Sequence, residues 1–156
     1  MSQPSLLWRL RRRALTALRD RNERHLTPEA MLAARRQALA RSEQRHGHGS
    51  WQALVAAHNL ANWFREAGRP EEALPLDREL SEACRQKFGD DDRRTVIAQV
   101  VLATTLADIG AAEEAEGLLE RAVNFLRLHE GESADCADAM EALVRVRQSE
   151  RGRRPR

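Results

Sequence analysis

Apolar residues along the chain recur with the spacing of an α-helix rather than with the alternation of a strand. Similar stripes predict helices over seven ranges, joined by short loops: 5–24, 28–45, 50–67, 70–87, 92–109, 112–128 and 133–149. The stripe of the third range holds Trp51, Leu54, Val55, Ala57, Leu60, Ala61 and Phe64. No segment carries a strand pattern, so the sequence predicts an all-α fold.

Glycine, proline and acidic residues mark the ends of these predicted helices. Gly68 and Gly89 each follow a stripe directly, where a helix commonly ends with a residue in the left-handed conformation. Pro70 opens the next helix, and the two glutamates that follow it favour the positive end of the helix dipole. The three aspartates 90–92 offer N-caps for the helix after Gly89.

The pattern repeats with a period of 42 residues. Blocks 47–88 and 89–130 share ten identical positions without a gap, including the glycine that opens each block. Residues 5–46 join this register more weakly, and the chain from 131 supplies half a unit. Each unit holds two helices that cannot bury their stripes alone, so the units are expected to stack into a solenoid.

These residues resemble a known repeat family. The segment Leu60-Ala61-x-x-Phe64-x-x-x-Gly68-Arg69-Pro70-Glu71-Glu72-Ala73 resembles the core of a tetratricopeptide repeat. The 42-residue period and the stretch His58-Asn59-Leu60-Ala61 resemble the kinesin-light-chain type. The resemblance implies one domain, 1–149: a right-handed solenoid of about three helix pairs and a capping helix, followed by an Arg-rich disordered tail. The units are 5–46, 47–88 and 89–130, the cap is 131–149 and the tail is 150–156.

One family position departs from the pattern. We call the first helix of each unit helix A and the second helix B. In the family, helix B usually carries an aromatic residue four positions after the alanine of Glu-Glu-Ala. Here that position holds Arg35, Asp77 and Leu119 in successive units. Two interpretations stay open: Arg35 and Asp77 pair across neighbouring B helices, or they are two separate solvated charges.

The resemblance also implies a function and a site. Members of this family bind peptide segments or partner proteins on the concave face, which the A helices line, so we expect a non-enzymatic adaptor or scaffold. In relatives, asparagines at the positions of Asn59 and Asn62 bind the peptide backbone, since an amide both donates and accepts. Alternatively, these two are ordinary exposed helix residues. The groove positions are Arg13, Thr16, Asp20 and Arg24; Val55, His58, Asn59, Asn62 and Arg65; and Ile97, Val100, Val101, Thr104 and Asp108.

The net charge of +2 hides an asymmetry. Residues 1–46 carry +7 and residues 89–130 carry −5. A basic patch of four arginines has three interpretations: a solvated helix face, a docking surface, or a contact with nucleic acid or an anionic membrane surface. The docking surface would take an acidic partner or, in a head-to-tail oligomer, the acidic region of a second copy. A regulatory protein that contacts nucleic acid is the alternative function, and such contact would weaken steeply with salt. The patch consists of Arg9, Arg11, Arg12 and Arg13.

Signatures of enzymes and of metal sites are absent from the sequence. It holds no G-x-x-x-x-G-K phosphate loop, no G-x-S-x-G turn and no H-E-x-x-H helix. His46 and His48 lie in a loop without further ligands nearby, which favours a plain turn over a metal site. The sequence therefore predicts no catalytic residue, no cofactor and no metal.

The two cysteines and the lengths of the apolar runs indicate the cellular compartment of the protein. Cys84 and Cys136 form neither a disulfide framework nor a zinc motif, and we interpret them as reduced thiols in a cytoplasm. No apolar run approaches the roughly 18 residues of a membrane-spanning helix. The sequence thus predicts a cytoplasmic protein with no membrane span.

Overall fold

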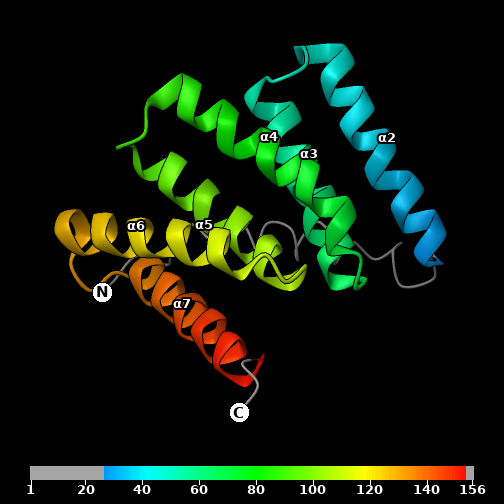
Figure 1. Ribbon diagram of the computed structural model, residues 1–156. Helices are drawn as coiled ribbons and strands as arrows, with labels where there is room; N and C mark the ends of the chain where they lie inside the picture. The colour runs from blue at the N-terminus through cyan, green and yellow to red at the C-terminus, as the bar shows by residue number, and fades with distance from the viewer. Residues whose placement is uncertain (1–26, 154–156) are drawn as a thin grey trace.

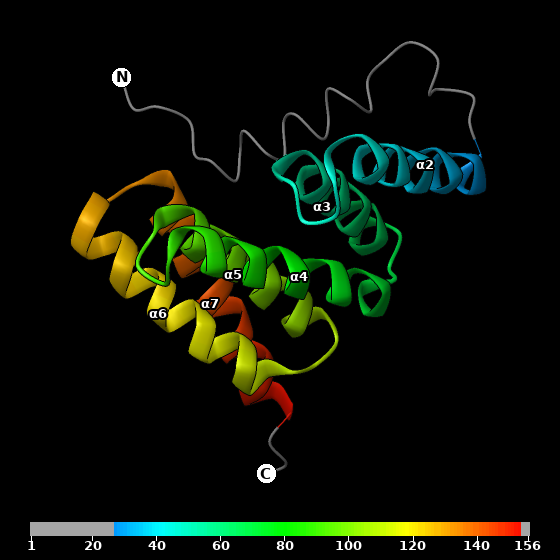
Figure 2. The same ribbon diagram turned by 90° about the horizontal axis from the view of Figure 1, so that it is seen from above.

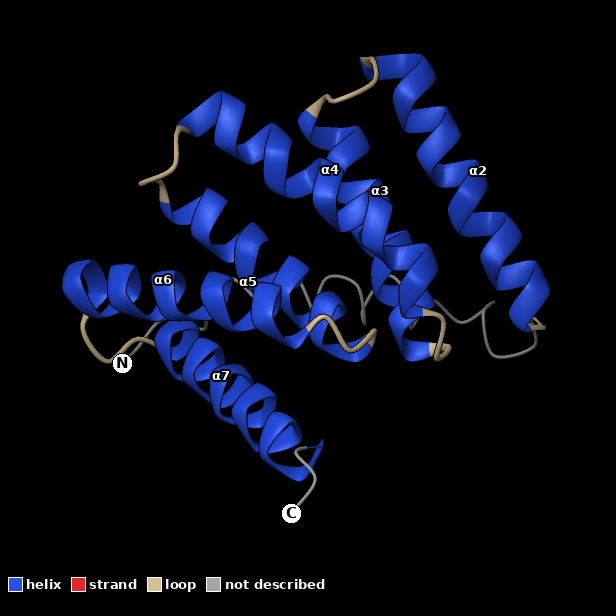
Figure 3. Cartoon of the chain, viewed as in Figure 1, coloured by secondary structure: helices blue, strands red, loops and turns tan. Residues whose placement is uncertain are grey.

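The computed structural model describes residues 27–153, and this part of the chain is entirely helical apart from short turns (Figure 3). Its six helices agree with six of the seven predicted ranges, with most ends within two residues. The first predicted helix, 5–24, lies outside the described residues. The helices are α2 (Pro28–His46), α3 (Trp51–Glu66), α4 (Pro70–Phe88), α5 (Arg93–Asp108), α6 (Ala112–Glu130) and α7 (Ala134–Arg153).

The last helix is longer than predicted. It runs to Arg153, so the predicted disordered tail is wrong for residues 150–153, which are helical, and the rest of that tail, 154–156, lies outside the described residues. Glu150 and Arg151 are good helix formers, and arginines near the end of a helix interact favourably with its negative C-terminal end. These contributions offset the cost of Gly152, about 1 kcal/mol relative to alanine.

Local chemistry sets the helix ends as the sequence indicates. The side chains of Thr27, Ser50 and Asp92 accept hydrogen bonds from backbone N–H groups in the first turns of α2, α3 and α5. Helix α3 ends at a glycine with positive φ: Gly68 has a φ of 70°, and the next amide, Arg69 N–H, donates to Phe64 O at 2.8 Å. This is the Schellman arrangement that a glycine permits without strain.

The six helices form a stack in which each packs against the next along the chain, from α2 to α7 (Figures 1 and 2). Two pairs of alanines lie where helix A meets helix B. Ala61 and Ala73 belong to one apolar cluster in the second unit, and Ala103 and Ala115 belong to another in the third, all four with no exposed surface. Small side chains at these positions let the helices approach closely.

The largest apolar core lies among α5, α6 and α7 and includes Leu106, Leu119 and Leu126. Smaller clusters join α2, α3 and α4, where Phe64 and Leu60 pack beside the half-buried Met31 and Leu32. None of the helices in residues 27–153 combines the length and apolarity that crossing a membrane requires.

Candidate binding groove

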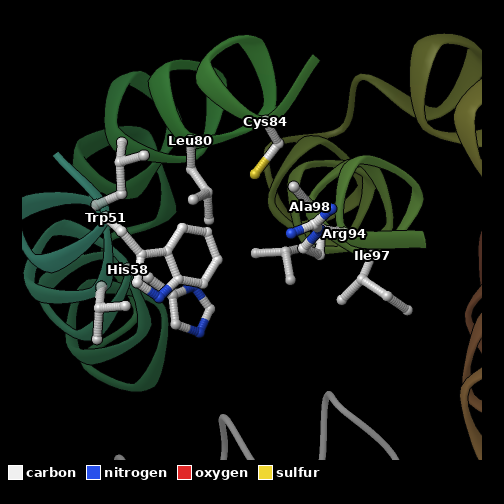
Figure 4. A pocket seen from close by; sticks show the side chains of 10 residues that line it. Trp51, His58, Leu80, Cys84, Arg94, Ile97 and Ala98 are labelled. Carbon is white, nitrogen blue, oxygen red and sulfur yellow. The ribbon is translucent and has the colours of Figure 1, made fainter. Parts of the chain in front are cut away.

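An apolar pocket lies between α3, α4 and α5, with a cavity volume of about 140 Å³. Four of the predicted groove positions line it: Val55 and His58 from α3, and Ile97 and Val101 from α5. The remaining lining comes from the first two turns of α3 and α5 and from α4. Figure 4 shows these side chains, which are Trp51, Leu54, Leu80, Cys84, Arg94 and Ala98.

The rim of the pocket combines aromatic rings and a cation. Trp51 is 41% exposed, and its indole meets the Phe88 ring edge-on with the ring centroids 6.3 Å apart. The Arg94 guanidinium lies 3.4 Å from the centroid of the Phe88 ring and also donates to Asp92. A large exposed tryptophan beside an apolar hollow is typical of a surface that binds a partner.

His58 is the polar group within this apolar lining. Its side chain is buried, and its Nδ1 atom has no hydrogen-bond partner. Burial, with a smaller contribution from the nearby Arg65 charge, lowers the pKa of His58 from 6.5 to about 4. The imidazole is therefore neutral at pH 7, and its unpartnered Nδ1 lies in a dry environment.

The low pKa of His58 makes stability depend on pH. Above pH 6.5 the side chain is neutral in both the folded and the unfolded chain, so it contributes no penalty. As pH falls from 6.5 to about 4 the unfolded chain takes up the proton first. The free energy of unfolding is therefore expected to fall by up to about 3 kcal/mol across this range.

Chemical denaturation at a series of pH values, on wild type and His58→Gln, measures this effect. The variant removes the titrating group, so its stability should vary less over the same range. Burial raises the pKa of Asp77, which acts in the opposite direction at low pH, so the difference between the two proteins is the informative quantity. Parallel pH profiles for both would show that His58 does not titrate in this way.

A buried polar network joins α3, α4 and α5 beside the pocket. The Asp77 carboxylate has no exposed surface, and its Oδ2 accepts from Arg65 Nη1 and from Thr105 Oγ1, both at 2.6 Å. The same Arg65 nitrogen also donates to Thr105 Oγ1 at 2.9 Å. Because one guanidinium bonds residues of two other helices, the network ties the second unit to the third.

This network corrects both interpretations of Arg35 and Asp77. Asp77 pairs with Arg65 on the preceding A helix rather than with Arg35, and it is not solvated. Arg35 is half-buried, and its Nε atom is buried without a hydrogen-bond partner. Leu119 holds the equivalent position in the next unit and is fully buried, so the position is a core position in both repeats.

The structure distributes the other predicted groove residues between surface and core. Asn62 is half-buried; its Nδ2 donates to Glu66 Oε1 at 2.9 Å, and its Oδ1 accepts from Arg65 at 3.2 Å. Asn59 is also half-buried, on the same helix. Thr104 Oγ1 donates to the carbonyl of Val100 at 3.0 Å, and Val100 itself belongs to the α5–α6–α7 core. The predicted residue Arg13 and the whole basic patch lie outside the described residues.

Sequence reasoning missed several residues of the site. Trp51 was placed in a buried stripe, yet it stands exposed at the rim of the pocket, and Leu80 and Cys84 reach the pocket from helix B. Thr105, which completes the Asp77 network, gave no signal in the sequence. These roles depend on how three helices meet, and helical periodicity reports only which face of one helix is apolar.

The sulfur and imidazole groups in the described part form no metal site. Cys84 and Cys136 are free and buried. His48 contacts Glu43 and Glu79, and these carboxylates raise its pKa. No group of three or more His, Cys, Asp or Glu side chains within residues 27–153 is placed to hold a metal ion.

Comparison with protein families agrees with the repeated helix pairs. Residues 52–128 match the family model described as a tetratricopeptide repeat, which spans α3 to nearly the end of α6. The chain is a tetratricopeptide repeat protein. Such repeats generally serve as non-enzymatic modules of protein–protein interaction. A comparison with curated proteins found no match.

Proposed function

We propose that this protein is an adaptor or scaffold that binds a peptide segment of a partner protein along the A helices α3 and α5. The observation that carries the proposal is the apolar pocket between them, with Trp51 exposed at its rim and His58 Nδ1 unpartnered inside. A cavity of about 150 Å³ holds a benzene ring. The pocket is of similar size, so it accommodates one apolar side chain of a bound peptide.

The finer features of the family complete this proposal. The repeats are of the kinesin-light-chain type and form a right-handed solenoid in a cytoplasmic protein; the first of the seven predicted helices, 5–24, lies outside the described residues. Arg13, which also lies outside the described residues, stands 42 positions before Val55 in the repeat register. The bound segment would then run over Asn59, Asn62 and Thr104.

The asparagines provide the direct test. The double variant Asn59→Ala, Asn62→Ala is expected to weaken peptide binding by about 1 kcal/mol or more, because each lost hydrogen bond to a peptide backbone is worth about that much. Peptides selected from a displayed random library against the wild-type protein supply the ligands. Fluorescence anisotropy of the labelled peptides then measures the affinity of each variant.

Asn124→Ala is the matched control, since Asn124 is an exposed asparagine on the B helix α6. It should leave affinity unchanged, and all variants should keep the wild-type circular dichroism spectrum. Equal affinity for the wild type and the groove double variant would move the binding site away from α3. Binding that weakens steeply with salt and ignores these asparagines would instead favour the basic patch.

A further inference from the structure

Within residues 27–153, helix α7 lacks a neighbour that the A helices α3 and α5 have. In the stack α3 packs between α2 and α4, and α5 packs between α4 and α6. Helix α7 lies 42 residues after α5 in the repeat register and packs on α6 and, more slightly, on α5. The place of the following helix B beside it is empty within residues 27–153.

The burial of equivalent positions shows which face this leaves uncovered. Residues 139, 142 and 143 of α7 are buried, as are their counterparts 97, 100 and 101 in α5. Seven other positions are buried in α5 but exposed in α7. We call these seven residues of α7 the outer face: Ala137, Asp138, Met140, Val144, Arg145, Arg147 and Gln148.

The outer face has an apolar centre with charges of opposite sign at its two ends. Met140 is 37% exposed and Val144 is 51% exposed, one helical turn apart. Asp138 lies towards the N-terminal end, and the exposed Glu141 lies beside Met140. Arg145 follows towards the C-terminal end. A helix that is acidic at one end and basic at the other is complementary to an antiparallel copy of itself.

We propose that the outer face of α7 is a homodimer interface, in which the α7 helices of two copies pack antiparallel about a twofold axis. In the two units whose helices are both described, α3 with α4 and α5 with α6, helix B runs antiparallel to helix A, so the second copy's α7 takes the orientation of a helix B packed on α7 (Figure 1). When the twofold axis crosses α7 at the level of residue 142, Met140 of one copy lies opposite Val144 of the second copy. A twofold contact of this kind is closed and uses the same patch on both copies.

Charge selects the antiparallel arrangement. With the axis beside residue 142, Glu141 approaches the second copy's Arg145, and the reciprocal pair forms on the other side of the axis. A parallel pairing would instead bring Glu141 against Glu141 and Arg145 against Arg145, which is repulsive. Arg147, also on the outer face, forms ion pairs with Glu116 and Glu120 on α6, so its charge is already compensated within one copy.

Sedimentation equilibrium of the full chain over a wide concentration range tests the interface. The wild-type protein is expected to reach twice the chain mass as concentration rises. The double variant Met140→Glu, Val144→Glu should remain monomeric, because four buried carboxylates would meet at the axis. Leu128→Glu is the matched control: Leu128 is 81% exposed on α6, outside the outer face, and its replacement should leave the dimer intact.

A charge reversal distinguishes this geometry from general loss of folding. Glu141→Arg alone should raise the dimer dissociation constant at least about tenfold, since it places like charges together. Adding Arg145→Glu restores the pairing with reversed signs and should recover the wild-type constant. Circular dichroism should report folded protein for every variant.

Three results would overturn the proposal. The first is a monomeric wild-type protein at every concentration. The second is a dimer that persists in the Met140→Glu, Val144→Glu variant. The third is a dimer that survives every change on α7 but dissociates when Arg11, Arg12 and Arg13 are changed to Glu, which would establish the head-to-tail contact instead.

Discussion

Replacing Asp77 by alanine is expected to lower the free energy of unfolding by about 3–5 kcal/mol, because it removes one partner of a buried ion pair. The Arg65 side chain is only 13% exposed and would keep its charge without the carboxylate that now compensates it. Thr105 would lose its acceptor in the same step. Chemical denaturation followed by circular dichroism measures the loss.

A multiple variant separates the cost of breaking the network from its net value. Well-packed apolar residues often replace buried ion pairs with little loss, and Leu119 already fills the equivalent position of the next unit. The triple variant Arg65→Met, Asp77→Leu, Thr105→Val should therefore recover most of the stability that Asp77→Ala loses. A loss below about 1 kcal/mol for Asp77→Ala would show that the carboxylate is not buried against Arg65.

Shortening Leu60 or Leu102 to alanine is expected to cost about 2–5 kcal/mol, since the cavity left behind adds to the lost transfer free energy. Both leucines hold the same position of helix A and are buried, at 4% and 6% exposure. Thermal or urea unfolding of each variant gives the value.

Val144→Ala is the matched control for these leucines. Val144 occupies the same repeat position 42 residues after Leu102 but is 51% exposed. At a protein concentration where the chain is monomeric, its truncation should change stability by no more than about 0.5 kcal/mol. A similarly small effect at Leu60 and Leu102 would contradict their burial between the helices.

Local signals were sufficient for the helices and for the family. Capping side chains, the glycines after the A helices and the proline at the start of α4 act within a few residues, so their effects are visible in sequence. The 42-residue register predicts the pairing of helices, and the packing of α3 on α4 and of α5 on α6 confirms it. The sequence pattern did not predict the end of α7, which runs to Arg153 rather than to residue 149.

Only the tertiary structure decided which side chains meet. Asp77 reaches Arg65, 12 positions earlier, and Thr105, 28 positions later, because α4 lies between α3 and α5. Repeat positions that are equivalent in sequence also differ in burial: within residues 27–153 a following helix packs beside α5, where Leu102 is buried, but none packs beside α7, where Val144 is exposed. A periodic pattern specifies which face of a helix is apolar, whereas the partner of a buried charge and the exposure of a face depend on whether another helix lies against it.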